Sequence, residues 1–145
     1  GQGPKREKYE ALAADLANPI VIDFYEKPRL LDLLAECDLY VHAADAEIEA
    51  ISCMEAFSSG LVPIIANSPK SATPQFALDD RSLFDAGSSD DLAAKIDYWM
   101  ENESQRRIME IRYALHGRQY GIDACVSQIE EMFRQAMEEA EDLHA

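Results

Sequence analysis

The sequence is poor in cysteine and contains no long apolar run. Its three cysteines, Cys37, Cys53 and Cys125, are odd in number and widely spaced, and no CxxC pair occurs, which argues against a disulfide framework and a zinc site. No stretch approaches the roughly 18 consecutive apolar residues of a membrane-spanning helix, and the first residues lack the apolar core of a signal peptide. We therefore expect a protein of the reducing cytoplasm in which Cys37 and Cys53 are buried thiols.

Positive charge is also scarce. Lys and Arg number 13 against 28 Asp and Glu, which gives a net charge of −15. Nucleic-acid binding needs clustered basic side chains that displace counterions from the phosphates. Nucleic acid is therefore not an expected partner.

The chain does contain a regular alternation of strand and helix patterns. Its 145 residues are 48% apolar, enough for one domain with a substantial core. Apolar or β-branched runs alternate with helical periodicity in units of about 20 residues, which is typical of a Rossmann-like parallel α/β sheet with helices on both faces. The expected strands are 20–24, 39–42, 61–66 and 82–84, and the expected helices are 5–16, 28–36, 48–59, 74–78, 88–102, 103–116 and 122–143.

Ligands of such sheets bind beyond the carboxyl ends of the strands, against helix N-termini. The loops at these positions are 25–28, 43–49 and 67–71. Glu47 stands where a strand turns into a helix in an apolar neighbourhood, and Glu55 follows eight residues later. A carboxylate there can accept hydrogen bonds from sugar hydroxyls, while the amides that follow can meet a phosphate. The same spacing at Glu130 and Glu138 is explained by a solvated helix face, so spacing alone leaves both interpretations open.

The run 39–66 resembles the Glu-(seven residues)-Glu segment of retaining family 4 glycosyltransferases. The strand, both glutamates, the Glu-Ala and Ser-Gly pairs and the proline before an apolar strand all fall in register. Further similarity covers Gly-x-Gly-Pro at 1–4, Asp-Phe-Tyr at 23–25 and Asp-Leu-Ala at 91–93 through Trp99. The sequence of residues 66–84 resembles even more closely that of bacterial transferases that glucosylate lipids, notably the cholesterol α-glucosyltransferases.

This resemblance implies that residues 1–145 are a partial nucleotide-sugar-binding domain, the C-terminal half of a two-domain GT-B enzyme, ending in a helix at about 122–143. The reaction would be glycosyl transfer with retention, from a UDP-sugar such as UDP-glucose to a lipid or sterol hydroxyl, without metal or other cofactor. Glu47 would be catalytic and contact the donor sugar, and Glu55 would hold the ribose. The backbone from Glu49 to Ser52 would meet sugar and diphosphate, and Phe24-Tyr25 would border the base. The implied donor-site residues are Glu47, Glu49, Ala50, Ile51, Ser52, Glu55, Phe24 and Tyr25.

The sequence also departs from the family pattern. Ala43-Ala44 replaces the usual Pro-Ser and Ile48-Glu49-Ala50 replaces Gly-Phe-Gly, so the expected loop is bulkier and more acidic. The family's diphosphate-binding Arg and Lys, together with two strands that lie between 20–24 and 39–42 in the usual sheet, would precede Gly1. We therefore expect the chain by itself to be inactive and prone to self-association through unpaired strand edges or its last helix. The complete enzyme would be cytoplasmic and peripheral at the inner membrane.

A different class of function is a non-catalytic α/β interaction domain. Such a domain would associate through its acidic helical face or through the apolar stripe of the last helix. That stripe comprises Val126, Ile129, Phe133, Ala136, Met137 and Ala140. Among single residues, His42 at a strand end fits a general base less well than a structural role, because no orienting carboxylate is evident, and Trp99 is expected in the core.

Overall fold

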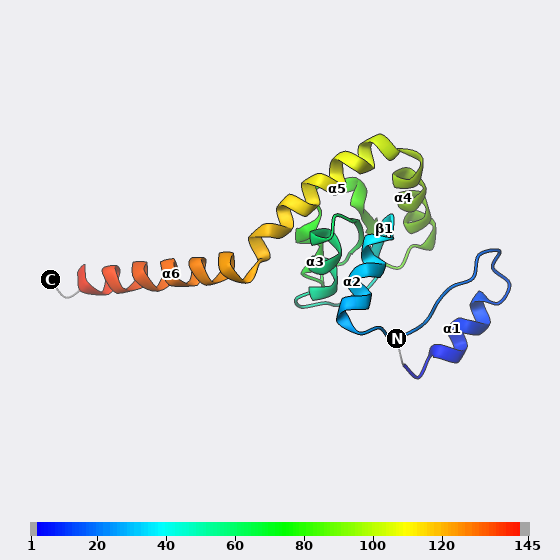
Figure 1. Cartoon of the computed structure of the whole chain (residues 1–145), viewed down its shortest axis with the longest axis horizontal. Coiled ribbons are helices and arrows are strands. Elements are labelled where there is room, and N and C mark those ends of the chain that lie inside the picture. Colours follow the sequence, from blue (N-terminus) through cyan, green and yellow to red (C-terminus); the bar gives the residue numbers. More distant parts are fainter. Residues whose placement is uncertain (1–2, 143–145) are drawn as a thin grey trace. The chain divides into compact units, whose positions relative to one another are not determined.

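The computed structural model describes residues 3–142 (Figure 1). The chain divides into two compact units, Gly1–Leu33 and Leu34–Ala145. The larger unit contains the sheet and the loops at its carboxyl end, so it holds most of the predicted site.

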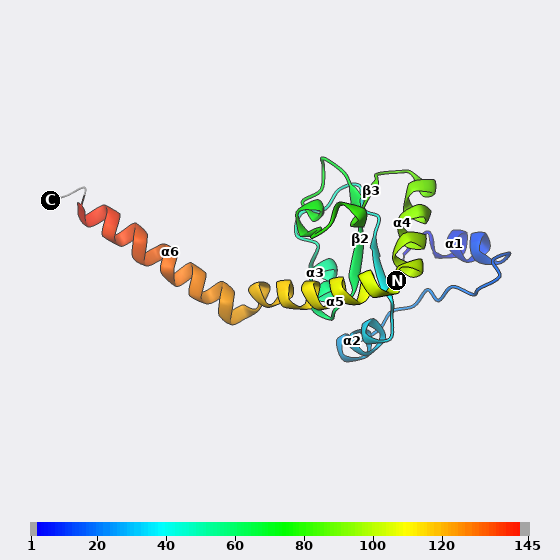
Figure 2. The same ribbon diagram turned by 90° about the horizontal axis from the view of Figure 1, so that it is seen from above.

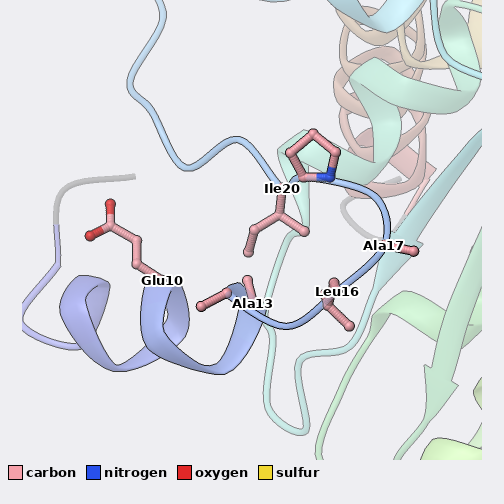
Figure 3. Close-up of a pocket in the computed structure, with 7 residues that line it drawn as sticks. Glu10, Ala13, Leu16, Ala17 and Ile20 are labelled. Atoms are coloured by element: carbon pink, nitrogen blue, oxygen red, sulfur yellow. The ribbon is translucent and has the colours of Figure 1, made fainter.

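The N-terminal unit contains the helix α1 (Arg6–Ala13) and the start of α2 (Lys27–Ala35). No residue from 3 to 33 is buried. An open hollow of about 370 Å³ lies between the end of α1 and the loop that follows, where Ala13, Leu16 and Ile20 line it (Figure 3). This unit therefore has no core of its own among the described residues.

The prediction of a strand at residues 20–24 is wrong. This segment forms no strand, and its apolar side chains stay in solvent, with Val21 76% and Phe24 62% exposed. A strand exists only when its backbone pairs with a neighbour, and within residues 3–142 no segment pairs with this one. β-Branched composition alone did not decide the structure here.

The larger unit is built on a parallel sheet of β1 (Leu39–His42), β2 (Val62–Asn67) and β3 (Leu83–Asp85), in the order β1-β2-β3. The register places Leu39 opposite Val62 and Ile65 opposite Leu83. The helix α3 (Ile51–Ser58) connects the first two strands, and the 3-10 turns η1 (Thr73–Phe76) and η2 (Asp80–Ser82) lie between the second and third. The predicted parallel α/β class is confirmed.

Central β2 is buried from Val62 to Ala66 because it has a strand on each side and helices over its faces. Figure 2 shows the strands running between α3 and α4 (Ser89–Glu101). Gly60 ends α3 with a φ of 93°, the left-handed conformation expected of it. Ser88 caps α4 by accepting a hydrogen bond from the Asp91 backbone N–H at 3.2 Å.

The core lies between α3, the sheet and α5 (Glu103–Gly117). Phe57 is fully buried, with its ring centroid 5.5 Å from that of Phe76 and 6.1 Å from that of Tyr113. Trp99 is also fully buried, as predicted, and so is Cys53. Cys37 is exposed, contrary to prediction, because it follows the end of α2 rather than entering the sheet.

After the turn η3 (Arg118–Tyr120), α6 (Ile122–Asp142) extends beyond α5 (Figure 1). Its predicted apolar stripe is exposed, as shown by Val126 at 44%, Ile129 at 50% and Phe133 at 60%. Within residues 3–142, no helix combines the length and apolar character needed to cross a membrane.

Candidate functional site

Glu47 lies in the loop between β1 and α3, and its carboxylate turns back onto that loop. Oε1 accepts hydrogen bonds from the backbone N–H of Ile48 at 2.8 Å and of Glu49 at 3.4 Å. Hydrogen bonds from the Ile48 and Ala50 amides hold the pKa of Glu47 below its ordinary value. The side chain is therefore an ionised acceptor that also shapes the loop.

The loop that follows β2 lies against the Glu47 loop. The Glu47 carbonyl accepts a hydrogen bond from the Ala72 backbone N–H at 3.0 Å, and Glu47 and Ser71 form an isolated parallel bridge. Asp45 fastens the same two loops, because it accepts hydrogen bonds from Ser68 Oγ at 2.8 Å and Lys70 Nζ at 2.9 Å. The structure thus brings together two of the three predicted ligand loops.

The first turn of α3 begins at an unusual backbone position. Ala50 has φ 49° and ψ 48°, a left-handed conformation that costs an L-residue about 1 kcal/mol. Its carbonyl accepts hydrogen bonds from the amides of Cys53 at 2.8 Å and Met54 at 3.2 Å. The resembled family motif has glycine at this position, so Ala50 follows a backbone path suited to glycine. The amides of Ile51 and Ser52 have no acceptor within the helix and face its N-terminal end.

Predicted donor-site residues gather around this turn. Glu47, Glu49, Ala50 and Ile51 line an open hollow of about 390 Å³, together with Ile48. Glu55 is half-buried on α3, three residues after Ser52 and so on the same helix face. These residues come from one continuous segment, and the αL turn at Ala50 folds it around the hollow.

Phe24 and Tyr25 belong to the N-terminal unit. They lie in the extended segment before α2, where the Phe24 backbone N–H donates to Asp23 Oδ1 at 2.8 Å. The site built from the larger unit contains the other six predicted residues.

Sequence reasoning missed a hydrogen-bonded group beside the site. Tyr40 Oη lies 2.9 Å from Ser52 Oγ and 3.2 Å from His42 Nδ1. The alternation of side chains along a strand does place Tyr40 and His42 on one face, which was an available signal, but nothing in the sequence links them to Ser52 on the following helix. In the part of the chain that the structure describes, no three His, Cys, Asp or Glu side chains are grouped so as to hold a metal ion.

The fold and the site define a parallel α/β domain with an acidic loop and a helix N-terminus at the carboxyl end of its sheet, the edge at which such folds bind their ligands. The family described as "Glycosyl transferases group 1" matches residues 1–114, so the chain belongs to that family. The crystal structure of the catalytic domain of cholesterol-alpha-glucosyltransferase from Helicobacter pylori is similar, with 50% sequence identity and a TM-score of 0.79. This similarity covers 83% of the present chain and 76% of the other. Among curated proteins, none matches the chain.

Proposed function

We propose that this chain is the donor-binding domain of a retaining glycosyltransferase that transfers glucose from UDP-glucose to a lipid or sterol hydroxyl. One observation carries the proposal. In a chain 50% identical to a cholesterol-alpha-glucosyltransferase catalytic domain, the Glu47 loop and the first turn of α3 meet at an open hollow beyond β1. The transferase class follows from the family, and the donor, the acceptor and the stereochemical course are the proposal.

The diphosphate is assigned to the first turn of α3. The amides of Ile51 and Ser52 point out of the helix N-terminus, where the helix dipole favours an anion. The chain carries a net charge of −15, so these oriented amides act against a repulsive background. We therefore expect weak binding of the nucleotide, in the millimolar range, with the contacts concentrated at this turn.

The two glutamates are assigned to hydroxyl groups of the donor. An ionised carboxylate has about four acceptor positions. Glu47 Oε1 accepts from the amides of its own loop, and we assign the remaining acceptor positions of the carboxylate to the sugar hydroxyls. We assign Glu55, one turn after Ser52 on α3, to the ribose hydroxyls. The assignment of Phe24 and Tyr25 to the base stays a prediction from the resemblance.

Exposed apolar side chains beside the hollow support a lipid or sterol acceptor. Ile48 is 85% exposed and Ile51 57% exposed, and both line the hollow. Solvent-facing isoleucines next to a carboxylate suit an amphipathic acceptor that presents a hydroxyl and an apolar body. We further propose a cytoplasmic enzyme that meets this acceptor at the membrane surface.

A titration with UDP, followed by amide NMR of the full chain, tests the donor site. Shifts concentrated between Glu47 and Glu55 are expected at millimolar UDP. The competing function, an interaction domain that uses the exposed stripe of α6, predicts no shifts with UDP and concentration-dependent shifts in α6. That second outcome would replace the proposed function.

Two variants separate the roles of the glutamates. Glu55→Gln is expected to weaken UDP binding about tenfold or more, because charge-assisted hydrogen bonds to ribose hydroxyls are lost. Glu47→Gln is expected to leave UDP affinity nearly unchanged while weakening UDP-glucose, because its partner is the sugar. Glu130→Gln on α6 is the matched control and should change neither affinity. Equal UDP affinity of Glu55→Gln and the unaltered chain would eliminate the ribose role.

A further inference from the structure

Tyr40, His42 and Ser52 form a hydrogen-bonded chain that joins β1 to the first turn of α3. Tyr40 and His42 are two residues apart on one strand face, and their rings stack with centroids 6.2 Å apart. Tyr40 Oη is the central group, 3.2 Å from His42 Nδ1 and 2.9 Å from Ser52 Oγ. His42 is only 7% exposed, whereas Ser52 lies at the surface. The hydrogen-bonded chain therefore runs from the buried His42 ring to the exposed Ser52 hydroxyl.

Counting protons leaves two arrangements of this chain when His42 is neutral. In the inward arrangement, Ser52 donates to Tyr40, Tyr40 donates to His42 Nδ1, and the imidazole proton sits on Nε2. In the outward arrangement, His42 Nδ1–H donates to Tyr40 and Tyr40 donates to Ser52. The Ser52 hydroxyl can then donate its own proton to an acceptor outside this group of three residues. Burial raises the pKa of Tyr40, which keeps its phenol protonated and able to donate in either case.

His42 Nε2 distinguishes the two arrangements. This atom is buried and has no hydrogen-bond partner within residues 3–142. The inward arrangement leaves a buried N–H without an acceptor, whereas the outward arrangement leaves only an unused lone pair. In the outward arrangement the single lone pair of Nε2 has no donor. Orphaned buried N–H donors are rarer in proteins than under-satisfied acceptors, and this preference favours the outward arrangement.

We infer that Tyr40 and His42 are positioning residues that turn the Ser52 hydroxyl proton outward, as a donor to an anionic oxygen held at the first turn of α3. The inference rests on the proposed function, which places a nucleoside diphosphate there. The Ser52 hydroxyl then adds a side-chain donor to the amides of the same turn. None of the described residues that line this hollow is basic, so an oriented hydroxyl gives the anionic oxygen an additional hydrogen-bond donor.

The direction of the hydrogen-bonded chain can be read without any ligand. Nitrogen-15 shifts of the His42 ring in the full chain report which nitrogen carries the proton. We expect the Nδ1–H form. Observation of the Nε2–H form would overturn the inference while leaving the proposed donor site intact.

A double-mutant cycle on UDP affinity tests the link to the ligand. Ser52→Ala should weaken UDP binding about tenfold, because a hydrogen bond to a charged oxygen is lost. Tyr40→Phe should weaken it about threefold by releasing the hydroxyl, and should have no further effect in the Ser52→Ala background. Tyr120→Phe, which removes a phenolic hydroxyl from the end of η3, is the matched control.

The outcomes of the cycle are distinct. An equal loss from Tyr40→Phe in both backgrounds would show that Tyr40 acts only on the fold, and would overturn the inference. Absence of UDP binding by the unaltered chain would instead refute the proposed function, and with it the ligand assigned to Ser52. Coupling between the two substitutions, together with the Nδ1–H form of His42, is the result that supports the inference.

Discussion

Replacing Gly117 with alanine tests the packing that holds α3, and so the site, against α5. Gly117 ends α5 where it meets the last residue of α3. A Cβ at this position would lie 2.3 Å from Ser58 Oγ, 2.7 Å from Ser58 Cα and 2.8 Å from Ser58 Cβ. The hydroxyl can rotate away, but the Cα can move only if the two helices separate.

The expected cost combines two opposing effects. Overpacking against a backbone atom lies at the upper end of the usual range, about 3 kcal/mol. Alanine is about 1 kcal/mol more favourable than glycine in a helix, which leaves a net loss of about 2 kcal/mol in the free energy of unfolding. For a domain of this size, the melting temperature should fall by roughly 8 °C.

Urea and thermal unfolding followed by circular dichroism measure this loss. Gly3→Ala is the control, because no heavy atom lies within 4 Å of the added Cβ. Combining Gly117→Ala with Ser58→Gly should recover only part of the stability, since the contact with the Ser58 Cα remains. A loss below about 0.5 kcal/mol, which is typical of a surface substitution, would refute the close approach of the two helices.

Two further predictions concern thiol reactivity and a titrating carboxylate. Burial raises the pKa of Cys53 to about 12. At about pH 8, iodoacetamide should therefore alkylate exposed Cys37 rapidly and Cys53 only after unfolding. Equal alkylation rates of the two cysteines would contradict the burial of Cys53. Hydrogen bonds from Lys70 and Ser68 hold the pKa of Asp45 below its ordinary 3.8, so carboxyl NMR should give a midpoint under that value. Because the folded pKa is the lower one, the contribution of this contact to stability is present above the ordinary pKa and is lost as the pH falls through the folded value. A Lys70→Met variant should move the Asp45 midpoint back towards 3.8, and an unmoved midpoint would show that Lys70 does not set it.

The strands of the sheet could be predicted where their apolar patterns agree with their surroundings. The run 61–66 is continuously apolar because β2 is covered on both faces, and Gly60 before it is the residue type that a left-handed helix end favours. By contrast, the equally β-branched run 20–24 forms no strand. Its β-branched residues favour a strand, but a strand also needs a neighbouring strand to pair with, and none of the described residues pairs with this segment.

The same division applies to the site. The sequence by itself determined the acidic loop, the helix that follows it and the family to which they belong, because these are features of one contiguous segment. Only the tertiary structure decided that Ala50 takes a left-handed turn, that the loop of Asp45 is fastened to Ser68 and Lys70, and that Tyr40 reaches Ser52. The contacts of Asp45 and Tyr40 join segments that are distant along the chain, and their geometry is set by how strands and helices pack rather than by the local sequence pattern.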